Sequence, residues 1–95
     1  MNLNAAEQVK RWQKWESIVS FQATNLPAKE ALKKLLSLIG ETDFAMPDKL
    51  TGTVTIDVRN KKFNDIFQQV QQQIKPMVFP EMRQKLTLKA FGAPN

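Results

Sequence analysis

The sequence feature that most constrains the fold is a unit that occurs twice: a segment of alternating polarity followed by an amphipathic helix. In the first unit, residues 18–23 alternate and residues 27–39 carry one apolar stripe. In the second, residues 53–59 alternate and residues 63–74 carry apolar side chains at positions i, i+3, i+4, i+7 and i+11. Periods of two and of 3.6 residues are typical of strands and helices that bury one face. The two units therefore predict a domain in which helices cover sheets.

Proline, glycine and asparagine mark the expected ends of these segments. Pro27 suits the first turn of a helix because its missing N–H would have no partner there, and Gly40 supplies a left-handed stop. Asn60 is predicted to turn the chain after its strand, and Pro76 to end the second helix. The exposed side of that helix is predicted to carry five glutamines: Gln68, Gln69, Gln71, Gln72 and Gln73.

Shorter segments complete the predicted order. Apolar residues of one parity within residues 42–46 predict a short strand. Residues 77–79 are predicted to form a strand, residues 80–84 a turn and residues 86–89 a closing strand. Residues 5–16 form a first amphipathic helix. The whole order is then α-β-α-β-β-α-β-β.

The N-terminal helix carries two tryptophans, Trp12 and Trp15, beside the cations Lys10, Arg11 and Lys14. A helix of this composition can lie on a membrane surface. The favoured interpretation is that the indole rings dock on the domain or on a neighbouring segment, and the membrane surface is the alternative.

The composition removes most catalytic chemistry. The 95 residues include no Cys and no His, which excludes zinc held by cysteine, haem held by histidine and nucleophiles activated by histidine. Four aspartates are the remaining candidates, but their spacing matches no metal loop, and each suits a turn, a strand surface or a helix start: Asp43, Asp48, Asp57 and Asp65. No phosphate-binding glycine motif occurs. We therefore expect neither enzymatic activity nor a cofactor.

The net charge of +5 leaves nucleic acid as an alternative partner. However, the 14 basic residues are interleaved with 9 acidic ones along the whole chain. The outward positions of the second unit's strand offer no aromatic platform for bases: they are Thr53, Thr55, Asp57 and Arg59. No apolar run is long enough to cross a bilayer. We therefore expect neither nucleic-acid binding nor direct membrane insertion.

Residues 18–90 resemble the secretin and TonB short N-terminal domain. The matching features, in order, are the strand at 19–23, the proline entry into a helix with Ala31 and Leu32, Gly40, a strand with Phe44 and Pro47, the turn at 50–52, the strand at 54–58, Asn60, and a helix with Phe63, Ile66 and Phe67. The chain is closer to the secretin branch because residues 60–63 follow their strand directly. The turn typical of the transducer branch is replaced here by residues 73–76.

The resemblance implies an α+β fold in which two helices pack between a two-stranded and a three-stranded sheet, with an extra N-terminal helix. Residues 1–17 are then a helix or linker, residues 18–91 the domain and residues 92–95 a C-terminal tail. It implies a non-catalytic interaction domain of a bacterial secretin-type secretion or pilus machine. Such a domain works in the periplasm, attached to the outer membrane through its parent protein or complex. Its partners are protein components of that machine, and it can pack as a homo-oligomeric ring. The alternative is the signalling domain of a TonB-dependent transducer.

Two surfaces are candidates for partner binding. One is the outward face of the strand at residues 53–59: Thr53, Thr55, Asp57 and Arg59. The other is the glutamine face of the second helix: Gln68, Gln69, Gln72 and Gln73. The expected mechanism is strand addition at an exposed sheet edge, which uses backbone groups and requires no particular side chains. An ordinary solvated surface is the alternative for both.

Overall fold

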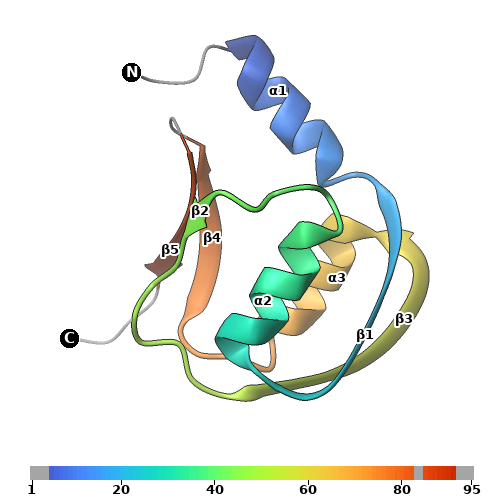
Figure 1. The fold of residues 1–95 in the computed structure, drawn as a ribbon, viewed down its shortest axis with the longest axis vertical. Coiled ribbons are helices and arrows are strands. Elements are labelled where there is room, and N and C mark those ends of the chain that lie inside the picture. Colours follow the sequence, from blue (N-terminus) through green and yellow to red (C-terminus); the bar gives the residue numbers. More distant parts are fainter. Residues whose placement is uncertain (1–4, 83–84, 92–95) are drawn as a thin grey trace.

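Two helices lie between two separate sheets in the computed structural model, which describes residues 5–82 and 85–91 (Figure 1). These helices are α2 (Ala28–Ser37) and α3 (Phe63–Gln71). A further helix, α1 (Ala5–Lys14), projects from one end of the molecule. The predicted α+β fold, with two helices between a two-stranded and a three-stranded sheet, is thus confirmed.

The two-stranded sheet pairs β1 (Ile18–Pro27) with β3 (Thr53–Lys62) in antiparallel register. Both strands run further than the alternation predicts, and Asn60 does not turn the chain. Asn25 and Asn60 instead adopt φ angles of 50° and 54° inside the strands, at the two places where the register shifts. Asparagine tolerates this left-handed conformation, so each of these residues forms a bulge through which the strand continues.

The three-stranded sheet has the order β2-β5-β4, from β2 (Phe44–Ala45), β5 (Leu86–Phe91) and β4 (Met77–Met82). The turn predicted at residues 80–84 is wrong for residues 80–82, which belong to β4; residues 83–84 lie outside the described part, as does the predicted tail at 92–95. Pro80 fits in this strand because its position points its missing N–H away from β5. Val78, two residues earlier, likewise directs its N–H away from β5, to the side chain of Gln71.

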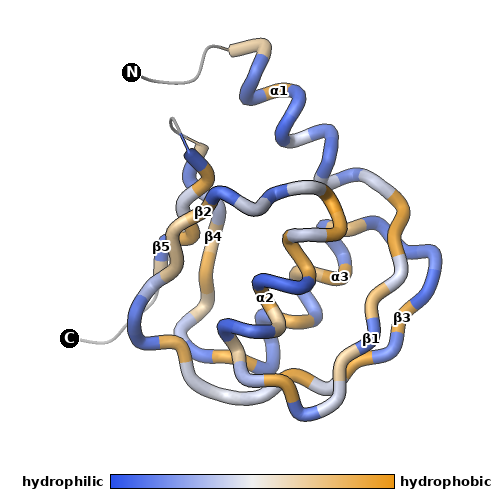
Figure 2. Tube along the Cα trace, in the orientation of Figure 1, coloured by the Kyte–Doolittle hydropathy of each residue, from blue (hydrophilic) through white to orange (hydrophobic). Residues whose placement is uncertain are grey.

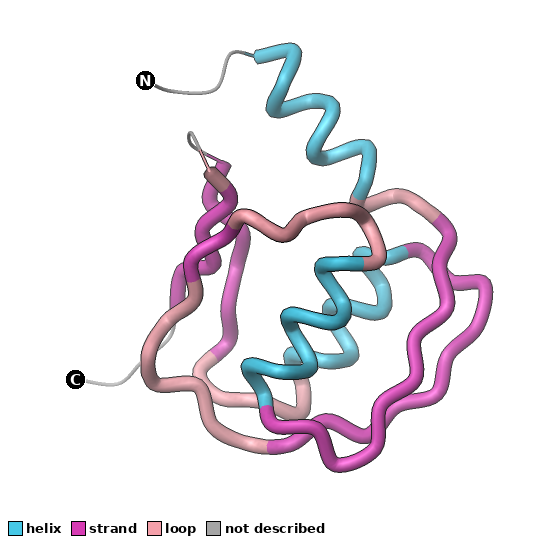
Figure 3. Tube along the Cα trace, viewed as in Figure 1, coloured by secondary structure: helices cyan, strands magenta, loops and turns pink. Residues whose placement is uncertain are grey.

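Two loops that join the three-stranded sheet to the rest of the domain are tied to each other. One follows β2 and the other follows α3 (Figure 3). Thr51 donates its N–H to the carbonyl oxygen of Lys75 at 2.8 Å, and Lys75 donates back at 3.0 Å. Gly52 lies beside this bridge with a φ of +103°, and its carbonyl oxygen accepts the N–H of Ala28 at the start of α2. The N-terminal end of α2 is therefore held by a backbone hydrogen bond to the loop that follows β2.

The core fills the space between the sheets, where the apolar stripes of α2 and α3 meet the inner faces of the strands. Hydrophobic residues recur along both helices and along the strands (Figure 2). The largest fully buried side chains of the core come from both helices, both sheets and the residue after α1: Leu32, Leu35, Leu36, Phe63, Ile66, Phe67, Val70, Val54, Val78, Leu86, Leu88 and Trp15. Burial on two sides explains why Ala31 and Phe67, at the margins of the stripes, are also buried. Leu38 departs from this pattern, because the helix ends before it and the side chain is exposed.

Helix α1 joins the domain through the residues at and after its C-terminal end. No residue of α1 itself is buried, whereas Trp15 is buried in the core cluster. The carbonyl oxygens of Trp15 and Ser17 accept the N–H groups of Asn64 and Phe63 at 2.8 Å, and so cap α3, which has no side-chain cap. Docking of an indole ring on the domain is confirmed for Trp15.

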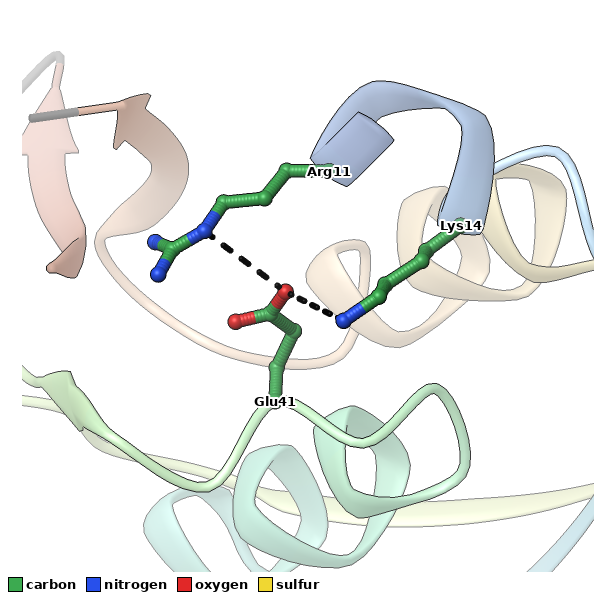
Figure 4. A network of polar contacts seen from close by, with 3 residues as sticks. All are labelled: Arg11, Lys14 and Glu41. Carbon is green, nitrogen blue, oxygen red and sulfur yellow. Dashed lines mark ion pairs between the residues drawn. The ribbon is translucent and has the colours of Figure 1, made fainter. Parts of the chain in front are cut away.

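Two cations of α1 converge on one buried carboxylate in the segment between α2 and β2 (Figure 4). The Nζ atom of Lys14 lies 3.6 Å from Oε1 of Glu41, and the Nε atom of Arg11 lies 4.0 Å from the same oxygen. Glu41 is an acidic side chain that is almost fully buried, and the two cations offset part of the cost of removing it from water.

We expect Glu41→Gln to loosen α1 while the domain stays folded. Amide exchange in α1 should accelerate about tenfold, because the helix loses its charged attachment and buries no side chain of its own. The free energy of unfolding should fall by at most about 1 kcal/mol, because the Lys14 side chain is 47% exposed and its ion pair is screened by solvent. Hydrogen exchange measured by NMR checks both. Asp43→Asn, which breaks an exposed ion pair with Lys85, is the control, and unchanged exchange in α1 of the Glu41 variant would contradict this account.

Candidate interaction site

The outward face of β3 is where the sequence predicts it, with Thr53, Thr55, Asp57 and Arg59 all exposed. Its polar groups are largely engaged within the chain. The N–H of Thr55 donates to Oε1 of Gln73 at 2.9 Å, and the hydroxyl oxygen of Thr55 accepts the N–H of Asn25 at 3.0 Å. Asp57 and Arg59 form an exposed ion pair of 4.0 Å. These features are those of a solvated surface.

The predicted glutamine face is divided by the structure. Gln73 turns towards β3, as its bond to Thr55 shows, and Gln69 is exposed. Gln68 and Gln72 line a groove. The expectation that Gln71 is exposed is wrong, because Gln71 is only 5% exposed and its Oε1 atom accepts the N–H of Val78 at 2.9 Å. Helix periodicity puts Gln71 on the apolar side, and the bond to β4 satisfies its oxygen there.

The groove lies between α1, α3 and β4 and has a volume of about 360 Å³. The aromatic rings of Trp15 and Phe67 form part of its lining. The ring centroid of Trp15 lies 4.8 Å from that of Phe63 and 4.7 Å from that of Phe67, in edge-to-face arrangements. The Trp12 ring, 5.8 Å from that of Trp15, lines the groove from α1.

The opposite wall belongs to β4 and continues onto the outer face of the three-stranded sheet. Met77, Phe79 and Pro80 line the groove, and Phe79 also lines a second hollow beside it. Its ring centroid lies 5.0 Å from that of Phe91 on β5, and the Nζ atom of Lys89 lies 5.8 Å from the centre of the Phe91 ring. We call this set the aromatic surface: Trp12, Met77, Phe79, Pro80 and Phe91.

Most of the aromatic surface is not predicted from the sequence. Met77, Val78 and Phe79 are all apolar, so β4 shows no alternation that would separate an inner face from an outer one. Only Val78 points inward, and both of its neighbours are exposed. The signal available in the sequence was a strand that is apolar on both faces, which predicts either full burial or an outward contact surface.

The free edge of β4 is poorly suited to strand addition. At two successive outward positions it offers a guest strand no donor, because the N–H of Val78 is bonded to Gln71 and Pro80 has no N–H. The mechanism expected from the sequence therefore lacks its backbone donors at Val78 and Pro80, beside the groove. Contact there depends on side chains.

No protein-family model, curated protein or solved structure matches the chain. Within residues 5–82 and 85–91, no helix has the length and apolar character needed to span a membrane. Over the same residues, no three of the side chains His, Cys, Asp or Glu gather where they could hold a metal ion. What the chain does is therefore inferred from its fold and its surfaces.

Proposed function

We propose that this chain is a non-catalytic protein–protein interaction domain of a bacterial secretin-type secretion or pilus machine. It works in the periplasm, attached to the outer membrane through its parent protein or complex, and binds protein components of that machine. It packs as a homo-oligomeric ring in the full assembly. The proposal is supported by the resemblance of residues 18–90 and by the two-sheet fold that this resemblance implies.

The observation that carries the docking role is the aromatic surface. Trp12, Met77, Phe79 and Phe91 each expose 40–50% of their surface, although large apolar side chains are usually buried. Adjacent exposed apolar groups are typical of contact sites, and aromatic residues and methionine are enriched at the centres of protein interfaces. This surface also adjoins a preformed groove, which gives a partner a defined place to bind.

Identification of the bound partner tests this function. The affinity-tagged chain, crosslinked and purified from its own cells, should retain a secretin or another component of the secretion or pilus machine. The double variant Phe79→Ser/Phe91→Ser should reduce the recovered partner at least about tenfold, since hot-spot aromatics contribute 2 kcal/mol or more. Leu38→Ser is the matched control, because Leu38 is 42% exposed and Phe79 40% exposed, on different parts of the fold.

Three outcomes would contradict the proposal. Recovery of an anti-sigma regulator would favour the signalling domain of a TonB-dependent transducer. Recovery of nucleic acid that is lost with rising salt would favour a basic nucleic-acid binder. Equal recovery of the same partner by the wild type and the double variant would remove the aromatic surface from the interface.

A further inference from the structure

We infer that the groove between α1, α3 and β4 binds an extended, uncharged, proline-rich segment of a partner protein. The inference rests on the proposed docking function and specifies the chemistry of the docked segment. Three properties of the groove lead to it: its lack of charge, the state of the β4 edge, and a hydrogen-bond donor fixed in its wall.

The described residues that line the groove include no charged side chain. They are apolar or aromatic residues and four side-chain amides: Asn64, Gln68, Gln71 and Gln72. A charged side chain of the partner would lose its hydration in this groove and find no opposite charge among the described lining residues, at a substantial free-energy cost. The groove therefore selects an uncharged segment, although the chain as a whole carries a net charge of +5.

The edge of β4 then selects among uncharged segments. A guest in the β conformation needs donors and acceptors along the edge it joins, and the outward positions of Val78 and Pro80 provide no donor. A polyproline II segment does not need such a ladder, because its backbone is normally solvated and makes no internal hydrogen bonds. Its prolines also have no N–H that could be left unpaired in the groove.

Gln71 supplies a fixed donor for such a guest. Its oxygen must face β4, because only an acceptor can bond the N–H of Val78, and this assigns the amide orientation without ambiguity. The Nε2 group is thereby left as a donor for the groove that Gln71 lines. Since Gln71 is almost fully buried, this donor is held in place before a ligand arrives. A backbone carbonyl of the guest is the matching acceptor.

The aromatic side chains supply the apolar contacts. Trp12 on α1, the Trp15 and Phe67 rings, and Met77, Phe79 and Pro80 on β4 all line the groove. Grooves lined by aromatic rings, with polar groups for the guest's carbonyls, are the usual receptors for proline-rich segments. Trp12 also lines the groove, and its exposed indole carries an N–H that is a second donor.

A peptide titration tests the inference. The full 95-residue chain is titrated with the blocked heptapeptide acetyl-Ala-Pro-Pro-Leu-Pro-Pro-Ala-amide and followed by ¹⁵N NMR. We expect saturable binding that shifts the side-chain amide signals of Gln71 and the indole signal of Trp12. The same peptide with valine in place of each proline, which favours a strand, should bind at least about tenfold more weakly. Trp12→Ala should weaken binding at least about tenfold, and Leu38→Ser should leave it unchanged.

Other outcomes would overturn the inference. One is an affinity for the valine peptide equal to that for the proline peptide, and another is NMR shifts confined to the outer face of β3. The others are a Trp12→Ala variant that binds the proline peptide as tightly as the wild type does, and a wild type that shows no saturable binding. Binding to neutral lipid vesicles or self-association through the groove, with no peptide binding, would assign it to a different occupant. If an envelope partner is lost from the Phe79→Ser/Phe91→Ser variant while the peptide does not bind, the inference fails and the proposed function stands. If the peptide binds and no envelope partner is recovered, the proposed function fails.

Discussion

Trp15→Ala is expected to lower the free energy of unfolding by about 3–5 kcal/mol. Trp15 is only 2% exposed, and its ring packs edge-on against both Phe63 and Phe67. Removing the indole would leave a cavity between α3 and the segment that caps it. The hydrogen bond that the Asn64 N–H donates to the carbonyl oxygen of Trp15 limits the collapse that could fill this cavity. Domains of this size are marginally stable, so most of the stability would be lost. Urea denaturation followed by circular dichroism measures the change.

Trp12→Ala is the matched control for this experiment. Trp12 is three residues away, has the same ring, and is 46% exposed. We expect its replacement to change the free energy of unfolding by at most about 0.5 kcal/mol, as for most exposed positions. If Trp15→Ala lowered the free energy of unfolding as little as Trp12→Ala does, the Trp15 ring would not be part of the core.

Gly52→Ala is expected to destabilise the domain by about 2–4 kcal/mol. A Cβ atom at Gly52 would lie 2.6 Å from the carbonyl oxygen of Gln73, and the φ of +103° is strained for any residue with a side chain. The backbone cannot move away easily, because Thr51 is bonded to Lys75 and the carbonyl of Gly52 accepts the N–H of Ala28. Thermal unfolding of the variant should show a clearly lowered midpoint.

Gly40→Ala separates the steric clash from the backbone strain. Gly40 also has a positive φ, +76°, but a Cβ atom there would meet no atom within 4 Å. Its replacement should cost only about 1–2 kcal/mol, from conformation alone. Losses of the same size at the two glycines would contradict the proposed contact between Gly52 and the carbonyl of Gln73.

The architecture could be predicted where sequence periodicity and burial agree. Residues 28–37, 54–58 and 63–71 bury the apolar positions that the matching period selects, so α2, β3 and α3 follow from the sequence. The continuation of the strands through Asn25 and Asn60 could not be predicted, because each asparagine is held by a distant partner. The N–H of Asn25 donates to Thr55, and the N–H of Asn60 to the hydroxyl of Ser20, 40 positions away.

The candidate site was predicted less well, for two physical reasons. Gln71 lies four positions after Phe67 and three before Ile74, so its place on the buried side follows from helix geometry. Because glutamine is polar, the sequence predicted that Gln71 is exposed. Its burial is explained by the hydrogen bond that its oxygen accepts from the N–H of Val78 on β4. Met77 and Phe79 are exposed because nothing among the described residues covers the outer face of β4, which depends on the tertiary arrangement and not on local sequence.

Hydrogen–deuterium exchange, with the chain alone and saturated with the purified partner, tests most directly whether docking uses the aromatic surface. Slower exchange is predicted in residues 5–15, 64–72 and 77–82, which build the groove and the aromatic surface. Residues 53–59, the rival surface on β3, should exchange at an unchanged rate. Slower exchange confined to residues 53–59, with none around the groove, would contradict the central claim.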